Sequence, residues 1–272
     1  MLMKARFFAL VALVLGMASC AKDFAPEVQV GGEVDFTLSV AAPELTATRA
    51  DADGLNGHDS AYGAIDYLTD ADWENVDLRY ILEVYDVADS YVDAKPIKDR
   101  MVKVFDKYEP TTFELRLIPN RDYHFVVFAD FVEQGASAVA TVDAQKNTGK
   151  RHIIGETLAD IRIKDIADYE AEGKEAEKFL NNEYSDAYFG VMNYNPKHGT
   201  HNNNTKDNGE PLTLKRPYAK VRVVATDLHE VNLNVEPKSV AVNYTAKRPM
   251  AFNALTGKIS VIDESVNNVI YF

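Results

Sequence analysis

The chain has 272 residues, of which 46% are hydrophobic and 26% are charged, and its formal net charge is −13. This composition is typical of a folded globular protein of one or two domains and not of a disordered chain. The acidic balance and the lack of any Lys/Arg run argue against nucleic acid as a partner. Cys20 is the single cysteine, so neither an internal disulfide nor a CxxC site can form.

Residues 1–19 have the three parts of a signal peptide: a basic start, a short apolar run and small residues before Cys20. The ending "MASC" resembles the lipobox of bacterial lipoproteins, which implies that Cys20 is acylated and becomes the first mature residue. The next residues, "AKDFAPE", resemble in part the surface-export signal of Bacteroidota-type lipoproteins, which implies display on the outer membrane. The alternative is an ordinary signal peptide followed by an incidental cysteine.

A strand and a loop follow the leader. Apolar side chains alternate with polar ones over residues 34–40, which predicts a strand with one buried face formed by Val34, Phe36, Leu38 and Val40. The segment "TATRADADGLNGHDSAYG" (46–63) is rich in Asp, Gly and Ser and predicts an exposed loop that carries Arg49.

Further strands are predicted along the rest of the chain, at 78–87, 111–118, 123–132, 219–227, 239–246 and 257–262. The turn composition of residues 119–122 predicts that 111–132 is a hairpin. Residues 156–180 are the main helical candidate, divided at Gly173, and residues 192–211 are expected to be a long polar loop. The pattern predicts a mainly β fold, an antiparallel β-sandwich with one or two short helical insertions.

Five segments, in this order, resemble the fimbrillin or type V pilin superfamily of surface lipoproteins: "LRYILEVYD" (78–86), "YHFVVFADF" (123–131), "SDAYFG" (185–190), "LKRPYAKVRVVATD" (214–227) and "FNALTG" (252–257). The resemblance implies a transthyretin-like β-sandwich over residues 50–262, preceded by a lipidated leader at 20–49. Residues 263–272 are expected to be a tail or the start of a second domain that the sequence does not contain.

The same resemblance implies a route of assembly. A trypsin-like protease cuts after Arg49, the leader leaves with its strand, and a strand from another pilin subunit fills the vacated place. On that reading the removable strand holds Val34, Phe36, Leu38 and Val40, and its four side chains are expected to be buried. The alternatives are that Arg49 is a solvated loop residue, that the protein is an uncut pilus anchor that keeps its lipid, or that it is a surface glycan-binding lipoprotein. An adhesive subunit would also have a host or bacterial surface ligand.

The sequence contains no recognisable catalytic motif, so we expect no enzymatic activity and no cofactor. His198 and His201 form an H-x-x-H pair, but zinc would need a third ligand and a rigid frame, so we expect no metal site there. Ser60 lies in "DSA", a short motif that resembles the O-glycosylation site of Bacteroidota-type secreted proteins, unless the match is coincidental.

Overall fold

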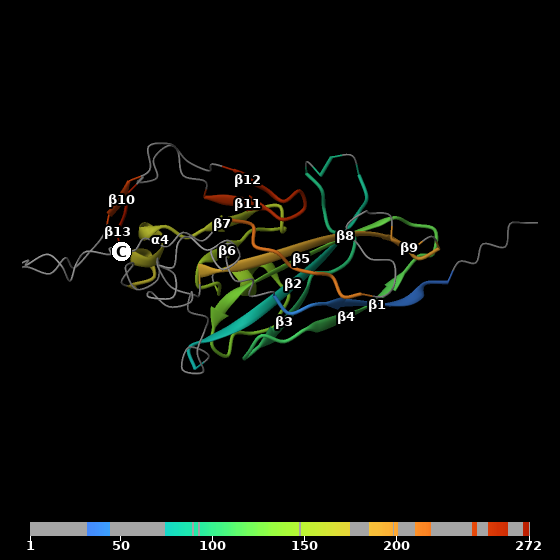
Figure 1. Cartoon of the computed structure of the whole chain (residues 1–272), viewed down its shortest axis with the longest axis horizontal. Coiled ribbons are helices and arrows are strands. Elements are labelled where there is room, and N and C mark those ends of the chain that lie inside the picture. The colour runs from blue at the N-terminus through green and yellow to red at the C-terminus, as the bar shows by residue number, and fades with distance from the viewer. Residues whose placement is uncertain are drawn as a thin grey trace, which may run out of the picture.

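The computed structural model describes residues 32–43, 74–88, 90–91, 93–146, 148–174, 185–197, 199–200, 210–218, 241–243, 250–260 and 269–271. Within these ranges the chain is mainly β, and its two helices are short (Figure 1). The strands are β1 (Val34–Val40), β2 (Val76–Asp86), β3 (Met101–Phe105), β4 (Thr111–Leu117), β5 (Tyr123–Glu133), β6 (His152–Ile154), β7 (Ile161–Ile163), β8 (Ala187–Asn195), β9 (Gly199–Thr200), β10 (Ala241–Asn243), β11 (Ala251–Asn253), β12 (Lys258–Ser260) and β13 (Val269–Tyr271). The helices are α3 (Val142–Lys146) and α4 (Ile166–Ala171).

A five-stranded antiparallel sheet, in the order β3-β2-β5-β8-β9, forms the centre of the fold. Its long strands β2 and β5 are buried along almost their whole length, on both faces. Such strands need a covering layer on each side, because both rows of side chains are removed from water. The central sheet therefore separates two hydrophobic cores.

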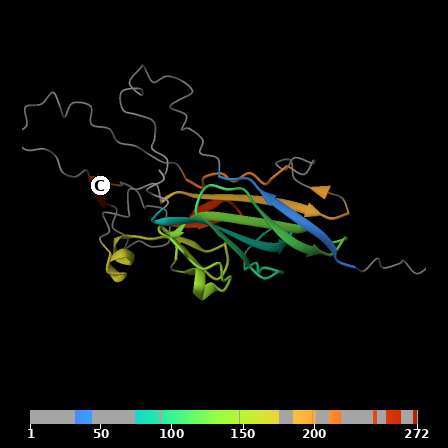
Figure 2. The same cartoon turned by 90° about the horizontal axis from the view of Figure 1, so that it is seen from below.

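The two outer layers are also antiparallel. On one face lies the pair β1-β4, and on the other lies the four-stranded sheet β12-β11-β7-β6. Figure 1 shows β1 and β4 below strands β2, β5 and β8 of the central sheet and β11 and β12 above them, and Figure 2 shows β1 running across the central strands. This arrangement confirms the predicted mainly β fold of packed antiparallel sheets with short helices.

The hairpin predicted over 111–132 is wrong. Both strands exist, but β4 pairs with β1, whereas β5 pairs with β2 and β8. The burial of the two strands explains why they pair with different partners. Strand β4 alternates between buried and exposed residues and suits an outer layer, whereas β5 is buried on both faces and must lie in the central sheet. The turn between them carries the chain from one layer to the other, and Ile118 N–H donates to the Tyr123 hydroxyl at 2.6 Å across it.

The helical prediction for 156–180 is partly wrong. Residues 161–163 form strand β7, which lies between β6 and β11. Helix α4 begins only after Asp165, whose side chain accepts from Asp168 N–H in a capping box, and it ends before Gly173, which has a φ of +70°. Helix α3 was not predicted at all. Strands β10 and β12 lie within the strands expected at 239–246 and 257–262, of which the structure describes residues 241–243 and 257–260, and the one expected at 219–227 lies outside the described residues.

Candidate functional site

Strand β1 is the part of the predicted site that the structure describes. It pairs with β4 in an unbroken antiparallel register from Val34 opposite Leu117 to Val40 opposite Thr111. Beyond this ladder, its carboxyl end is fixed by the segment around Leu212: Ala41 N–H donates to the Leu212 carbonyl at 2.9 Å, and Leu212 N–H donates to the Ser39 carbonyl at 2.7 Å. We call the surface that β1 covers, formed by β4, Phe125, Tyr194 and Leu212, the β1 site.

Burial increases steeply along β1. Val34 is 39% exposed, Phe36 is half-buried, and Leu38 and Val40 are 2% and 0% exposed. The expectation that four side chains are buried is therefore wrong at Val34, which lies at the open end of the strand. The full burial of Leu38 and Val40 and the partial burial of Phe36 together contribute about 4–8 kcal/mol to the docking of β1, at ~1.5–3 kcal/mol for each fully buried side chain.

Phe36 enters a group of aromatic rings on the central sheet. Its ring centroid lies 4.4 Å from that of Tyr194 and 5.4 Å from that of Phe125, and both pairs are stacked. The stack continues from Phe125 to Tyr123 at 6.0 Å. Phe36 is thus the one ring that β1 adds to rings already held by β5 and β8.

The outward face of β1 is held by polar contacts that water can reach. Glu33 lies 3.3 Å from Lys98 and 3.6 Å from Arg116, and Thr37 donates to Glu114 at 2.8 Å. The side chains of these ion pairs are well exposed, so the pairs contribute little to stability. The ladder and the three inward side chains therefore hold β1 in place.

A cluster of buried polar side chains, which we call the polar group, lies within the central sheet. Arg79 and Asp130 form a fully buried two-bond ion pair, with Nε–Oδ1 at 2.8 Å and Nη2–Oδ2 at 2.7 Å. Arg79 Nη1 also donates to the carbonyl and side-chain oxygens of Gln145 and to the Thr148 hydroxyl. A buried charge pair is tolerated only when its remaining donors are satisfied, and here Gln145 and Thr148 satisfy them.

A second set of polar contacts lies beside this group, where His152 Nδ1 is 3.7 Å from Asp130 Oδ2, beyond hydrogen-bond distance. The Tyr218 hydroxyl donates to the Ser185 carbonyl at 2.8 Å and lies 2.6 Å from His152 Nε2. Because the hydroxyl has one proton, His152 Nε2 must be the donor of that second bond. Burial and the nearby Arg151 hold the pKa of His152 well below its usual value, so the ring is neutral at pH 7.

These contacts involve all five of the segments quoted above. The Arg79–Asp130 pair joins the first segment to the second, and the Tyr218–Ser185 hydrogen bond joins the fourth to the third. The fifth segment contributes the Leu255 carbonyl, which lies 3.2 Å from His124 Nε2 in the second. These contacts have the features of structural ties between distant parts of the chain, since the carboxylate, the guanidinium and the hydroxyl all have hydrogen-bond partners.

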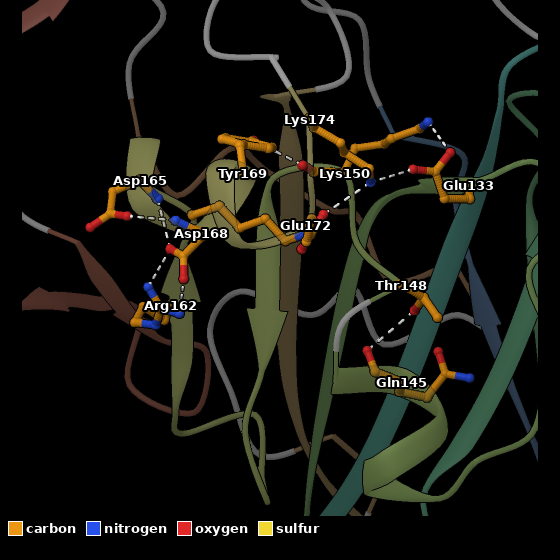
Figure 3. Close-up of polar contacts among 11 residues, drawn as sticks. Glu133, Gln145, Thr148, Lys150, Arg162, Asp165, Asp168, Tyr169, Glu172 and Lys174 are labelled. Carbon is orange, nitrogen blue, oxygen red and sulfur yellow. Dashed lines mark hydrogen bonds and ion pairs between the residues drawn. The ribbon is translucent and has the colours of Figure 1, made fainter. Parts of the chain in front are cut away.

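An alternating chain of charges fixes α4 to the end of β5 (Figure 3). Glu133 forms ion pairs with Lys150 and with Lys174, the latter at 3.0 Å, and Lys174 lies 3.0 Å from Glu172. Glu172 also pairs at 2.6 Å with Lys164, whose side chain is fully buried. Each of the three ammonium groups has a carboxylate partner, so this chain of charges also stabilises the fold.

Several residues singled out in the sequence lie outside the described residues: Cys20, Arg49, Ser60, His198 and His201. Within the described ranges, no three His, Cys, Asp or Glu side chains are grouped so that they could hold a metal ion. In the same part of the chain, no helix is long and apolar enough to cross a membrane.

Tyr194 is the residue of the β1 site that the sequence pattern does not reveal. The polar composition of residues 192–211 predicts a loop there, whereas β8 continues to Asn195. The signal was present in the alternation of Tyr188, Met192 and Tyr194, which places all three toward the core that β1 covers. The Asn and Pro residues that follow concealed it.

Comparison with known proteins gives one match. Residues 26–271 match the model of a family of unknown function, DUF6562. No curated protein and no solved structure matches the chain.

Proposed function

The chain belongs to the DUF6562 family, whose function is unknown, and from its own residues we propose that it is a fimbrial structural or adhesive subunit. In this proposal it is exported as a lipoprotein acylated at Cys20, reaches the surface of the outer membrane, and is assembled by strand exchange after cleavage at Arg49. Its partners are other pilin subunits, and its role is not enzymatic.

The observation that carries the proposal is the placement of β1. A single strand at the start of the described chain covers part of the hydrophobic core, and its only strand-length ladder among the described residues is with β4. Its loss would uncover apolar side chains next to the unpaired backbone of β4. Such a surface is satisfied by a strand from another molecule, since the new strand restores both the backbone hydrogen bonds and the apolar contacts.

The position of Arg49 supports the same mechanism. The last described residue after β1 is Pro43, and β2 begins at Val76, so Arg49 lies in the connection between a strand of the outer layer and a strand of the central sheet. Between Lys22 and Arg79 it is the only Lys or Arg. A trypsin-like protease that cuts between β1 and β2 therefore has one available position, and that cut separates β1 from the rest of the domain.

Limited proteolysis tests the proposal. Mature lipid-free protein, with Cys20→Ser to remove the acylation site, is incubated with dilute trypsin, and the products are identified by mass and by amino-terminal sequence. We expect the first cut after Arg49, a resistant fragment that begins at Ala50, and growth of multimers, detected by light scattering, once the cut is made. The Arg49→Gln variant should give neither the fragment nor the multimers.

Two results would contradict the proposal. If other sites are cut before Arg49, the loop is not the processing site. If the nicked protein keeps its leader and stays monomeric at high concentration, strand exchange does not follow from cleavage. Retention of an uncut, lipidated leader in outer-membrane fractions of the producing cells would instead favour the pilus-anchor alternative.

A further inference from the structure

The inward-facing side chains of β1 have different surroundings in the β1 site. Leu38 and Val40 are closed to water in the core, where Leu38 lies opposite Phe113 and Val40 opposite Thr111 in the ladder, and Val34 is 39% exposed. At Phe36, by contrast, two rings from different strands of the central sheet, Phe125 and Tyr194, are stacked against the inserted ring.

Part of the receiving surface is held by contacts that do not involve β1. With β1 docked, Phe125 and Tyr123 are 0% and 1% exposed, and their rings stack on each other at 6.0 Å. The Tyr123 hydroxyl is held by Ile118 N–H, and the Arg121 guanidinium lies over the Tyr123 ring at 5.9 Å while it pairs with Asp86. A preorganised receiving surface loses little conformational freedom when a strand binds, so its shape can select among strands.

From this geometry we propose that the β1 site selects an incoming subunit strand that carries an aromatic side chain at the position of Phe36, opposite Leu115. The proposal rests on the strand exchange proposed above and specifies the chemistry of the partner. A flat ring contacts Phe125 and Tyr194 together, and both contacts gain from ring geometry beyond the area buried. A branched aliphatic side chain fills less of the space and stacks on neither ring.

The rest of the partner's sequence follows from the same register. The residues two and four positions after the aromatic one occupy the places of Leu38 and Val40, which are closed to water, so they must be apolar. The residue two positions before it occupies the place of Val34, which is 39% exposed, so its identity matters little. The selected pattern is therefore aromatic-x-apolar-x-apolar, antiparallel to β4.

Competition between peptides tests this selection on the full mature chain. Lipid-free protein is nicked at Arg49 by trypsin with both fragments retained, and a fluorescent peptide of residues 33–43 is exchanged into it. Unlabelled peptides then compete. We expect the Phe36→Leu peptide to bind about 30-fold more weakly, as the loss of two ring pairs implies. The Phe36→Trp peptide and the matched control Val34→Ala should bind within about threefold of the original.

A variant of the receiving surface gives an independent measurement. In nicked protein carrying Tyr194→Leu, the preference for Phe36 over Phe36→Leu peptides should fall by about fivefold or more, because one of the two ring pairs is absent. Tyr194→Phe keeps the ring and should keep the preference, and circular dichroism confirms that both variants are folded.

The outcomes separate the two proposals. If the original peptide exchanges into the nicked protein but the Phe36→Leu peptide competes equally well, selection for an aromatic side chain is wrong and strand exchange stands. If the Tyr194→Leu and Tyr194→Phe variants discriminate equally, the selecting surface is not the ring group. If no peptide exchanges, strand exchange itself fails, and the selection that rests on it fails too.

Discussion

Local detachment of β1 can be measured with a buried thiol. Because Cys20 is the only cysteine, a Cys20→Ser, Val40→Cys protein has a single thiol, placed at a position that is 0% exposed. A thiol reagent reaches it only when β1 leaves its site. Replacing Leu38 with Ala in this background removes a side chain that is 2% exposed. Such a change costs about 2–5 kcal/mol in a core.

The Leu38→Ala substitution destabilises the closed state, in which β1 is docked, and not the open state, in which β1 has left its site. At about 3 kcal/mol, near the middle of that range, the equilibrium for opening rises about 150-fold, and the labelling rate rises by the same factor when opening and closing are fast. The matched control is Val34→Ala, which lies on the same face of the same strand but is 39% exposed, and it should change the rate less than about threefold.

The dependence of labelling on urea shows whether β1 opens by itself. Opening of one strand exposes less surface than global unfolding, so the slope of log rate against urea should be well below the equilibrium m-value. If the two slopes agree, the thiol is reached only through global unfolding and β1 is an integral strand. Equal rates for the Leu38→Ala and Val34→Ala proteins would refute the burial argument.

Three further predictions follow from other contacts. Asp130→Asn should lower the free energy of unfolding, measured in urea, by about 3–5 kcal/mol because it breaks a fully buried ion pair. The same change at the exposed Asp86 should cost less than about 1 kcal/mol. Similar losses at both positions would contradict the argument from burial. Gly190→Ala should speed labelling of the Val40→Cys thiol. The added Cβ would lie 2.8 Å from a backbone oxygen in the segment that holds the carboxyl end of β1, so this segment would have to move. An unchanged labelling rate would show that the segment does not control the detachment of β1. Burial lowers the pKa of His152 and of His124 in the folded protein, so the unfolded state takes up protons first as the pH falls. Stability should therefore fall below about pH 6.5, by up to ~1.4 kcal/mol per pH unit for each ring. In urea melts, His124→Gln and His152→Gln should each make this fall less steep, and pH profiles parallel to that of the wild type would show that the rings do not cause it.

Much of the strand content could be read from the sequence because periodicity is a local property. The alternation in β1 and β4 and the long apolar run of β5 each identify a strand. The same reading failed where a short segment was ambiguous. The triplet of β7 is too short to show a period, and its strand form comes from pairing with β6 and β11. Strand β8 was not among the predicted strands, and its last residues lie in the segment whose polar composition predicts a loop.

The β1 site could be predicted only in part. The apolar side chains at 36, 38 and 40 were identified correctly as an inward face, but the sequence did not distinguish them from Val34. Val34 occupies the first position of the ladder, opposite Leu117, and is 39% exposed there. The aromatic partners of Phe36 were also hidden, since Phe125 and Tyr194 are far from it in sequence and belong to two different strands.

The sequence pattern identified β1, β2, β4 and β5 as strands and showed which face of β1 turns inward, and it led to the expectations of a lipidated leader and a cut at Arg49. These depend on residue type and spacing over a few positions. The tertiary structure alone decided that β1 pairs with β4, that β5 lies between two layers, and that one ring of β1 stacks on two rings of the central sheet. Contacts such as that of Thr37 with Glu114 join residues 77 positions apart, and they are set by how the layers close on one another.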